Sequence, residues 1–289
     1  MSMSVKTEIN GLSKQNIAQP ICNFSLADLL PNTLTDIPAV SISMLDKVEA
    51  AAGLLSPHLE SFVDSLVVTD GERPVGSLDG MEIMREILKN PTFDFFINTE
   101  IGKIKNVQLV IVTKHTKLSD LLNLWKETGK AFAIISNQYH GYSAISARKL
   151  LEVGSLCDTD MSVKDLPKKS IVTFQKDQPM REIIYKMYKN KTRRLILEGT
   201  SLFISDRHII EKIATDLTFL HKTDNFLDMK ASEFKLDNVK MISGEITIPE
   251  ISKIMHNMHF PYVMTENRVI SPWDVALILA SKKLKFSSS

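Results

Sequence analysis

Cysteine, glycine, proline and long apolar runs are all scarce in this chain, and each scarcity excludes a class of protein. It has only two cysteines, Cys22 and Cys157, in 289 residues, which excludes a disulfide framework, and both are expected to be reduced thiols. Eleven glycines and eleven prolines are too few for long disordered stretches. No apolar run approaches the roughly 18 residues that span a bilayer, and the polar N-terminus lacks the apolar core of a signal peptide. We therefore expect a soluble cytoplasmic protein without a membrane partner.

Charge and catalytic motifs are also scarce. A net charge of +1 gives no global signature for binding to nucleic acid or to a membrane. The sequence has no Gly-rich phosphate loop, no G-x-S-x-G motif and no Cys/His nucleophile pair. His256 and His259 form an H-x-x-H pair, but no third zinc ligand is apparent nearby. These absences predict a protein that is not an enzyme and holds no metal.

What the sequence does contain is a motif that occurs four times. Each copy is an apolar strand end followed by an acid or hydroxyl residue that opens an amphipathic helix. The copies are anchored at Asp79, Ser146, Ser205 and Ser271, which are 67, 59 and 66 residues apart. Self-similarity at such a period indicates a repeat architecture. A unit of about sixty residues buries too little surface to be stable alone, so the repeats are expected to pair.

Every repeat shows the same order of predicted elements. A short lead-in helix is followed by a strand, an amphipathic helix, two further strands and a closing helix. The lead-in helices are predicted at 25–30, 100–104, 162–166 and 230–234. In the first repeat the helical face is predicted to be Leu45, Val48, Ala52 and Leu55. The helical crossover favours a parallel strand pair and the tight turn an antiparallel one, so each repeat predicts a small mixed sheet with both helices on one face.

This order and these motifs resemble the cystathionine-β-synthase (CBS) domain over about residues 23–285. The resemblance implies an α/β (α+β) fold of four βαββα-type CBS repeats, paired into two pseudo-twofold Bateman modules. The implied units are a flexible N-terminal arm at 1–22 and repeats at 23–95, 96–157, 158–222 and 223–289. The family ends each unit with G-x-x-[Ser/Thr]-x-x-Asp, often with Arg before the Asp. In the cleft between paired repeats, the Ser/Thr and Asp hold the phosphate and ribose of adenosine-containing ligands.

The fourth repeat matches this motif best, with Ser271 and Asp274 in the hydroxyl and acid positions. The resemblance implies that Asp274 holds a ribose. Trp273 stands where the family often has Arg, so a phosphate would need a cation from elsewhere. Arg207 of the neighbouring repeat and Arg193 or Arg194 on its second strand are the candidates. The same Ser-Pro-x-Asp pattern is also an ordinary helix cap.

The first two repeats depart further from the family motif. In the first, Asp79 and Glu82 occupy the hydroxyl and acid positions, and two carboxylates would repel a phosphate. That site is expected to be empty or to take a ligand without phosphate. In the second, Ser146 and Arg148 are kept, but Lys149 replaces the ribose-binding acid.

The third repeat keeps Ser205 and Arg207, and His208 replaces the acid. Arg148 and Arg207 can hold phosphate oxygens bidentately, or they are solvated helix residues. We count the hydroxyl, basic and acid residues of the last three motifs, together with Arg193, Arg194 and Trp273, as candidate ligand-binding residues.

The resemblance implies a non-catalytic regulatory protein with no required cofactor. Its ligand would be an adenine nucleotide (AMP, ADP or ATP) or S-adenosylmethionine, bound chiefly in the second module. Occupancy would shift the population of module conformations and so signal to an effector protein that the sequence does not identify. Whether the modules pack within one chain or across a homodimer is left open.

Two alternative functions are also compatible with the sequence. Three of the four motifs lack the hydroxyl–acid pair, so the repeats can also be a degenerate scaffold for protein assembly. The stretch 185–194 carries five positive charges beside aromatic residues, a pattern that can bind nucleic acid. Lys and Arg also suit a helix C-terminus, so a nucleic-acid partner is not expected.

Overall fold

The computed structural model describes residues 19–29, 35, 37–56, 64–136, 141–167, 169–222 and 225–286. Most of the expected N-terminal arm, residues 1–18, lies outside these ranges. The last residues assigned to that arm belong to the folded body instead. Ile21 and Cys22 are buried in the short helix η1 (Ile21–Asn23), so the arm boundary moves toward the N-terminus.

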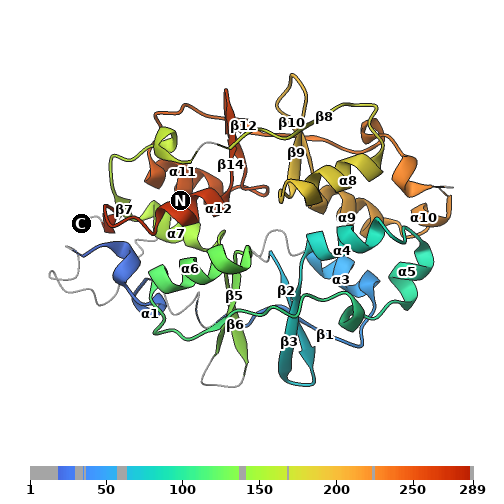
Figure 1. The fold of residues 1–289 in the computed structure, drawn as a ribbon, viewed down its shortest axis with the longest axis horizontal. Helices are drawn as coiled ribbons and strands as arrows, with labels where there is room; N and C mark the ends of the chain where they lie inside the picture. The colour runs from blue at the N-terminus through green and yellow to red at the C-terminus, as the bar shows by residue number, and fades with distance from the viewer. Residues whose placement is uncertain are drawn as a thin grey trace, which may run out of the picture.

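Four units with the same order of elements make up the fold (Figure 1). The first contains β1 (Ser41–Ser43), α3 (Val48–Leu55), β2 (Leu66–Asp70), β3 (Arg73–Leu78) and α4 (Gly80–Ile87). The second contains β4 (Ile111–Val112), α6 (Leu118–Thr128), β5 (Phe132–Ser136), β6 (Tyr142–Ser146) and α7 (Leu150–Ser155). The third contains β8 (Thr173–Phe174), α8 (Met180–Lys189), β9 (Arg194–Leu197), β10 (Leu202–Ser205) and α9 (Asp206–Thr215). The fourth contains β12 (Lys240–Met241), α11 (Ile248–His256), β13 (Val263–Thr265), β14 (Arg268–Ile270) and α12 (Pro272–Ile278).

The sheets have the mixed topology that the repeats predict. In every unit the first strand pairs parallel with the second, and the second pairs antiparallel with the third. A helix joins the parallel strands, and a short turn joins the antiparallel ones, as the two pairing modes require. The predicted α/β repeat is therefore confirmed.

The amphipathic helices bury most of the residues at the predicted spacing, although Ile254 of the fourth helix is only partly buried and Leu45 is exposed. In α6, Leu118, Leu121, Leu122 and Trp125 are fully buried. Leu45 was expected on the buried face of the first helix, but it is 65% exposed. It lies in the turn before α3, where its amide donates to the side chain of the strand residue Ser43. The prediction for Leu45 is wrong because this residue belongs to the turn, and α3 begins only at Val48.

The lead-in segments follow the predicted order in sequence, but they pack on the partner repeat. They form α1 (Leu26–Leu29), η3 (Ile101–Lys103), η4 (Val163–Asp165) and η6 (Ala231–Glu233). In the first pair, Ser25 is bridged to Lys117 at the start of the second unit's helix, and Glu100 is bridged to Lys47 before that of the first unit. The two repeats therefore exchange their lead-in segments.

The second pair shows the same exchange. Ser162, beside η4, is bridged to Thr247 of the fourth unit, and Lys230, beside η6, is bridged to Pro179 of the third. The exchange continues in the sheets, because β11 (Asp237–Asn238), just before the fourth unit, pairs with β10 of the third. Each repeat thus depends on its partner for part of its core.

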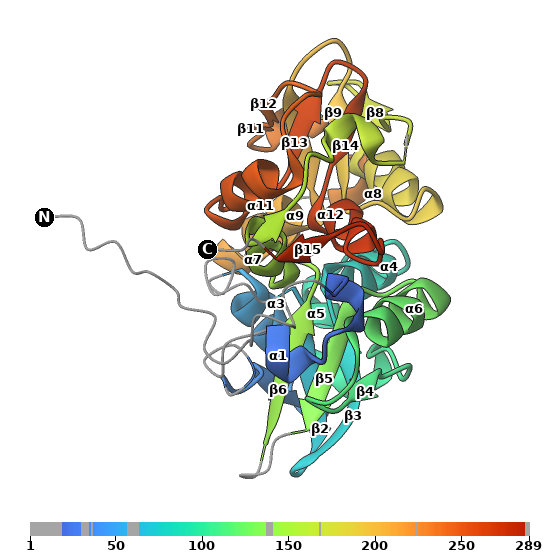
Figure 2. The same cartoon turned by 90° about the vertical axis from the view of Figure 1, so that its left-hand side faces the viewer.

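The repeats are packed in two directions (Figures 1 and 2). Within each pair the sheets face one another, with Val67 packed near Ile134 in the first pair and Ile196 near Tyr262 in the second. Between pairs the helices meet: α3 and α4 pack on α9, and α7 packs on α11 and α12. Two modules of paired repeats therefore form one body within a single chain.

The remaining elements lie between and beyond the four units. They are α5 (Phe93–Asn98), α10 (Phe219–Lys222), η5 (Phe226–Asp228), β7 (Cys157–Asp158) and β15 (Lys285–Phe286). β7 and β15 pair antiparallel, and the amide of Ile21 donates to the carbonyl of Leu284, so the two ends of the described chain lie together. In the described part of the chain, no helix combines the length and apolarity needed to cross a membrane.

Candidate functional site

The four repeats can be aligned on the first strand and the helix that follows it. Ile42, Val112, Phe174 and Ile242 all lie six residues before the first residue of that helix. Five residues before them, in the segment leading to the strand, stand Ile37, Val107, Lys169 and Asp237. We call the place of these four residues the lead-in position. In the second module, the side chain at the lead-in position of one repeat bonds to the fourth residue of the motif in the partner repeat.

In the second module the lead-in position bonds directly to the motif of the partner repeat. Asp274 accepts the backbone amide and the hydroxyl of Ser271 on Oδ2, at 2.9 and 2.6 Å. Its other oxygen, Oδ1, accepts Lys169 Nζ at 2.5 Å. The Asp274 side chain is 8% exposed, whereas that of Lys169 is 51% exposed. Asp274 thus caps the helix with Oδ2, and its Oδ1 forms an ion pair with the half-exposed Lys169.

A small cavity of about 250 Å³ adjoins this pair. Lys169, Ser170, Asn267 and Arg268 line it. Arg268 itself is buried and donates to the carbonyls of Val163 and Leu166, so it supports the exchanged lead-in segment. Of the two cations at this cavity, Lys169 is therefore the one that can move.

The motif of the third repeat makes the same contact with the residue types reversed. Here the motif supplies the basic residue, His208, and the lead-in position supplies the acid, Asp237. His208 Nδ1 accepts the amide of Ser205 at 3.1 Å, so its Nε2 carries the proton toward Asp237 Oδ2, 3.0 Å away. Burial lowers the pKa of His208, against the charge of Asp237, which raises it. Phe260 stacks on the imidazole with ring centroids 4.5 Å apart. This cleft is filled by the protein's own side chains.

In the first module Glu82 is bonded inside its cleft. It caps α4 by accepting the amide of Asp79 at 3.0 Å, and it also accepts Asn106 and forms an ion pair with Lys130. Burial, followed by the charge of Asp79, raises the pKa of Glu82 to about 7, although Lys130 opposes the shift. Burial alone would raise the pKa of Asp79 too, but Arg193, the hydrogen bond with Glu82 and Lys130 hold it well below its ordinary value.

The motif of the second repeat is arranged differently. Lys149 folds back along β6 and donates to the carbonyl of Ala144 at 2.6 Å. Ser146 is 3% exposed, and within the described residues its hydroxyl has no hydrogen-bond partner. The lead-in residue opposite this motif, Ile37, is apolar and half exposed. It therefore cannot form the polar side-chain bond that Lys169 and Asp237 form in the second module.

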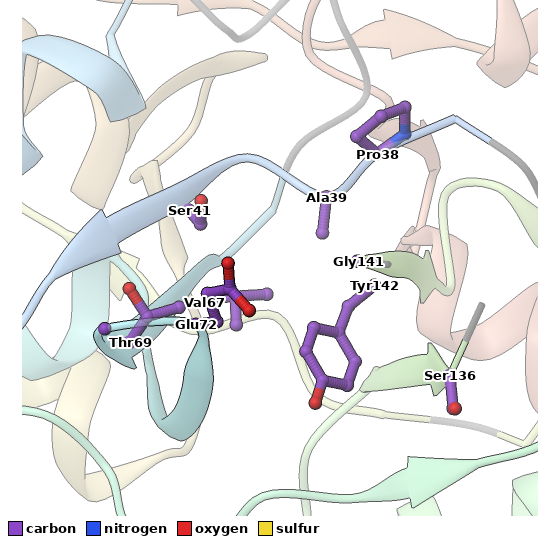
Figure 3. A pocket seen from close by; sticks show the side chains of 10 residues that line it. Pro38, Ala39, Ser41, Val67, Thr69, Glu72, Ser136, Gly141 and Tyr142 are labelled. Carbon is purple, nitrogen blue, oxygen red and sulfur yellow. The ribbon is translucent and has the colours of Figure 1, made fainter. Parts of the chain in front are cut away.

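A second cavity, of about 560 Å³, lies in the first module (Figure 3). It lies between the β2–β3 hairpin and β5 and β6, beneath the segment that leads into β1. The lining residues are Pro38, Ala39, Ser41, Val67, Thr69, Gly71, Glu72, Ser136, Gly141 and Tyr142. They offer one aromatic ring, several hydroxyls and a carboxylate, and none of them is a cation.

The candidate phosphate ligands Arg207 and Arg193 meet a set of acids where the two modules join. Arg207 Nη2 lies 2.6 Å from Asp64 Oδ1, and its side chain is 8% exposed. Arg193 Nε donates to Asp206 Oδ2 at 2.8 Å, and Asp206 is fully buried. Burial alone would lower the pKa of Arg193, but nearby acids, led by Asp206, outweigh it and raise that pKa. Both arginines are therefore bonded to carboxylates of the protein itself.

The remaining candidates make contacts between repeats. Arg148 donates to the carbonyls of Met258 and His259 just beyond α11, so it joins the second repeat to the fourth. Arg194 lies over the Tyr262 ring, with its guanidinium carbon 4.3 Å from the centroid. Trp273 packs beside Trp125, with centroids 6.3 Å apart. Trp273 thus packs against the core of the second repeat.

Several partners of these residues were not among the sequence candidates, and Lys169, Asp237 and Asp64 are three of them. Lys169 and Asp237 carry a signal in the sequence, because aligning the four repeats shows a charge at the lead-in position opposite each motif of the second module. Asp64 carries none, since its partner Arg207 is distant in the sequence and lies in the other module.

The basic stretch is mostly engaged within the fold. Lys186 donates to Gln178 Oε1 and the Thr173 carbonyl, while Arg193 and Arg194 contact Asp206 and Tyr262. Lys189 and Lys191 are exposed, as are the neighbouring rings of Tyr185 and Tyr188. As for metals, no group of three or more His, Cys, Asp or Glu residues able to hold an ion occurs in the described ranges.

Comparison with known proteins supports the fold. The CBS-domain family model matches residues 163–215, and no curated protein matches the chain. A Methanocaldococcus jannaschii protein, described as a proposed archaeal homologue of the gamma subunit of AMP-activated kinase, has a similar structure. It is 16% identical, with a TM-score of 0.70 over 84% of this chain and 97% of its own. An uncharacterised conserved protein from Pyrococcus horikoshii is 11% identical, with a TM-score of 0.50 over 83% and 95%.

Proposed function

Because the chain is a CBS-domain protein with two paired modules, we propose that it is a non-catalytic regulatory protein. It binds an adenosine-containing ligand beside Asp274 and passes the occupancy of that cleft to a protein partner. Among the four motifs, only Ser271 and Asp274 combine a hydroxyl with an acid, and this observation carries the proposal. The similarity in fold to a proposed AMP-activated kinase gamma homologue supports a regulatory role.

Ligand binding would replace one internal bond. The ribose hydroxyls would donate to Asp274 Oδ1 in place of Lys169 Nζ. Asp274 Oδ2 would keep its hydrogen bond with Ser271, so the helix cap is preserved. Lys169 is half exposed, so it can leave at little cost in desolvation. Its departure enlarges a cavity that at about 250 Å³ is slightly smaller than the usual range of ligand pockets. The released ammonium group is then available to a phosphate.

Calorimetric titration with ATP, ADP, AMP, adenosine and S-adenosylmethionine tests this proposal. Asp274→Asn removes the charge but keeps an acceptor for the cap, and we expect it to weaken binding roughly ten- to a hundredfold, since hydrogen bonds to charged groups contribute about 1.5–3 kcal/mol. Glu82→Gln, at the same motif position in the first repeat, is the matched control and should leave affinity unchanged. Equal losses in the two variants would rule out the assignment.

Lys169→Met provides a second test of the same site. Removing the internal partner of Asp274 should tighten adenosine binding, because the ribose no longer competes with an ammonium group. For AMP the gain should be smaller, since Lys169 would also serve the phosphate. Unchanged affinity for both ligands would mean that Asp274 does not hold the ribose.

A protein-assembly platform is the second candidate function. It is favoured by the internal bonds of Glu82, His208 and Asp274, which take up the ribose position in three of the four clefts. A platform predicts no thermal shift with any of the five ligands, in the native protein or in Lys169→Met. Nucleic-acid binding has less support, because three of the five charges in 185–194 contact other parts of the fold.

A further inference from the structure

The cavity of the first module, beneath the segment that leads into β1, has an apolar wall and a polar rim. Ala39, Val67 and the ring of Tyr142 supply carbon surface. Its volume of about 560 Å³ is within the usual range of ligand pockets. Figure 3 shows the Glu72 carboxylate reaching from the β2–β3 turn into the space between Ser41 and the Tyr142 ring. A ligand in this cavity would therefore meet both an apolar surface and a carboxylate.

The cavity owes part of its volume to one small residue. Ala39 and Ile171 both stand two residues after the lead-in position, in the first and third repeats. In the second module, Ile171 packs on the buried cluster between the sheets, which contains Ile196. In the first module, Ala39 packs on the corresponding cluster, which contains Val67. The alanine side chain has three carbons fewer than isoleucine, so it leaves space beside Val67 that the second module fills.

The polar side chains at the rim are available to a ligand. Glu72 forms no hydrogen bond or ion pair with any other residue that the structure describes. The hydroxyls of Ser41, Ser136 and Tyr142 likewise have no partner within the described ranges. Among the described lining residues only Glu72 carries a charge, and Arg73, the next residue, does not line the cavity. An anionic ligand would face this carboxylate without a counter-charge, whereas an ammonium group, which donates three hydrogen bonds and accepts none, suits these acceptors.

We propose that this cavity binds a small organic cation, with an aromatic or apolar body and one ammonium group. The body packs against Ala39 and Val67, and the ammonium group donates to the Glu72 carboxylate and to the hydroxyls of the rim. The face of the Tyr142 ring also attracts a cation. The site lies in the first module, and none of its residues belongs to the adenosyl site beside Asp274, so the two sites can be tested separately.

The test uses 3-phenylpropylamine, 3-phenylpropan-1-ol and 3-phenylpropanoate, which share a ring and chain and carry a positive charge, no charge and a negative charge. Calorimetry on the full chain at neutral pH should show saturable binding of the amine, roughly five- to tenfold tighter than that of the alcohol. The carboxylate should bind most weakly of the three. Added salt should reduce the advantage of the amine over the alcohol, because Glu72 is exposed and its charge is screened.

Two variants separate the charge of the site from its shape. Glu72→Gln keeps the size of the side chain and should weaken amine binding roughly fivefold while leaving the alcohol unaffected. Asp70→Asn is the matched control, because Asp70 is an exposed acid of the same hairpin that does not line the cavity. Ala39→Ile introduces the residue that the third repeat carries at this place and should abolish binding of both the amine and the alcohol. Its thermal midpoint shows whether the fold is kept.

The proposal is overturned if the alcohol or the carboxylate binds as tightly as the amine, or if the amine does not saturate. It is also overturned if Glu72→Gln and Asp70→Asn behave alike, or if folded Ala39→Ile still binds the amine. Asp274→Asn should bind 3-phenylpropylamine as the native protein does, so failure of this site and failure of the adenosyl site are distinguishable.

Discussion

The fourth residue of each motif shows how one position takes on different chemistry through its contacts. Glu82, His208 and Asp274 all cap a helix with one side of the side chain and bond to another element with the other. Asp274 shares its second oxygen with a half-exposed lysine. Glu82, by contrast, is buried next to a second carboxyl group. Sequence alone shows the acid but not whether its environment keeps it ionised.

The buried pair in the first module predicts a pH dependence of stability. Because the pKa of Glu82 is raised from 4.5 to about 7, the folded protein holds that proton more tightly than the unfolded chain. The unfolding free energy should therefore fall as pH rises from about 4.5 to about 7. Glu82→Gln should reduce this slope in urea titrations across that range. Glu250→Gln, an exposed acid at the same capping position of α11, should leave it intact, and a slope unaffected by Glu82→Gln would contradict the assignment.

A second residue-scale prediction concerns the ion pair between modules. Asp64→Asn removes a carboxylate charge that lies against the Arg207 guanidinium, whose side chain is 8% exposed. Removing one partner of a buried pair typically costs about 3 kcal/mol or more. Glu245→Gln breaks an exposed pair with Lys164 and should cost under about 1 kcal/mol. Chemical denaturation of the two variants checks this, and similar costs would show that the Asp64 pair is effectively solvated.

At the scale of elements, the packing of α7 against α11 joins the second and fourth repeats. A Cβ at Gly154 would lie 2.5 Å from Ser252 Oγ and 3.1 Å from its Cβ. We expect Gly154→Ala to destabilise the protein by about 1–3 kcal/mol through overpacking. A Cβ at Gly53 in α3 would meet no atom of the described residues within 4 Å, so Gly53→Ala should stabilise by up to about 1 kcal/mol. Thermal unfolding measures both, and a stabilising Gly154→Ala would show that the helices can separate freely.

The elements also show how far the sequence could predict the fold. The order of strands and helices and the mixed sheets followed from apolar spacing, since α6 and α8 bury the residues at three-to-four intervals. The exchange of lead-in segments did not follow. Segments such as η3 and η6 are three residues long and carry no periodicity, so their partner is decided by tertiary contacts.

The same limit applies to the candidate site. Ser271 and Asp274 lie together as the motif implied, because residues three apart at a helix start are close in space. The placement of Arg207 depends on Asp64 in another module, and Trp273 depends on Trp125 in another repeat. Such long-range partners leave no mark in local spacing.

At the scale of the whole molecule, one body is built from two modules whose cores run into each other. The core of the first repeat continues into the third, and helices of the second repeat pack on the fourth. A ligand bound in a cleft of one module can therefore act on the other module through the side chains packed between them. This arrangement is suited to a regulatory protein, because a ligand that favours one orientation of a repeat biases its neighbours as well.

Native mass spectrometry with AMP is the sharpest test of the site at Asp274, because it counts ligands per chain. We expect one AMP on the native protein and on Glu82→Gln at concentrations where Asp274→Asn carries none. Thermal midpoints of the three proteins would confirm that each is folded. AMP bound equally to Asp274→Asn and the native protein, or to neither, would contradict the proposal that Asp274 holds an adenosyl ligand.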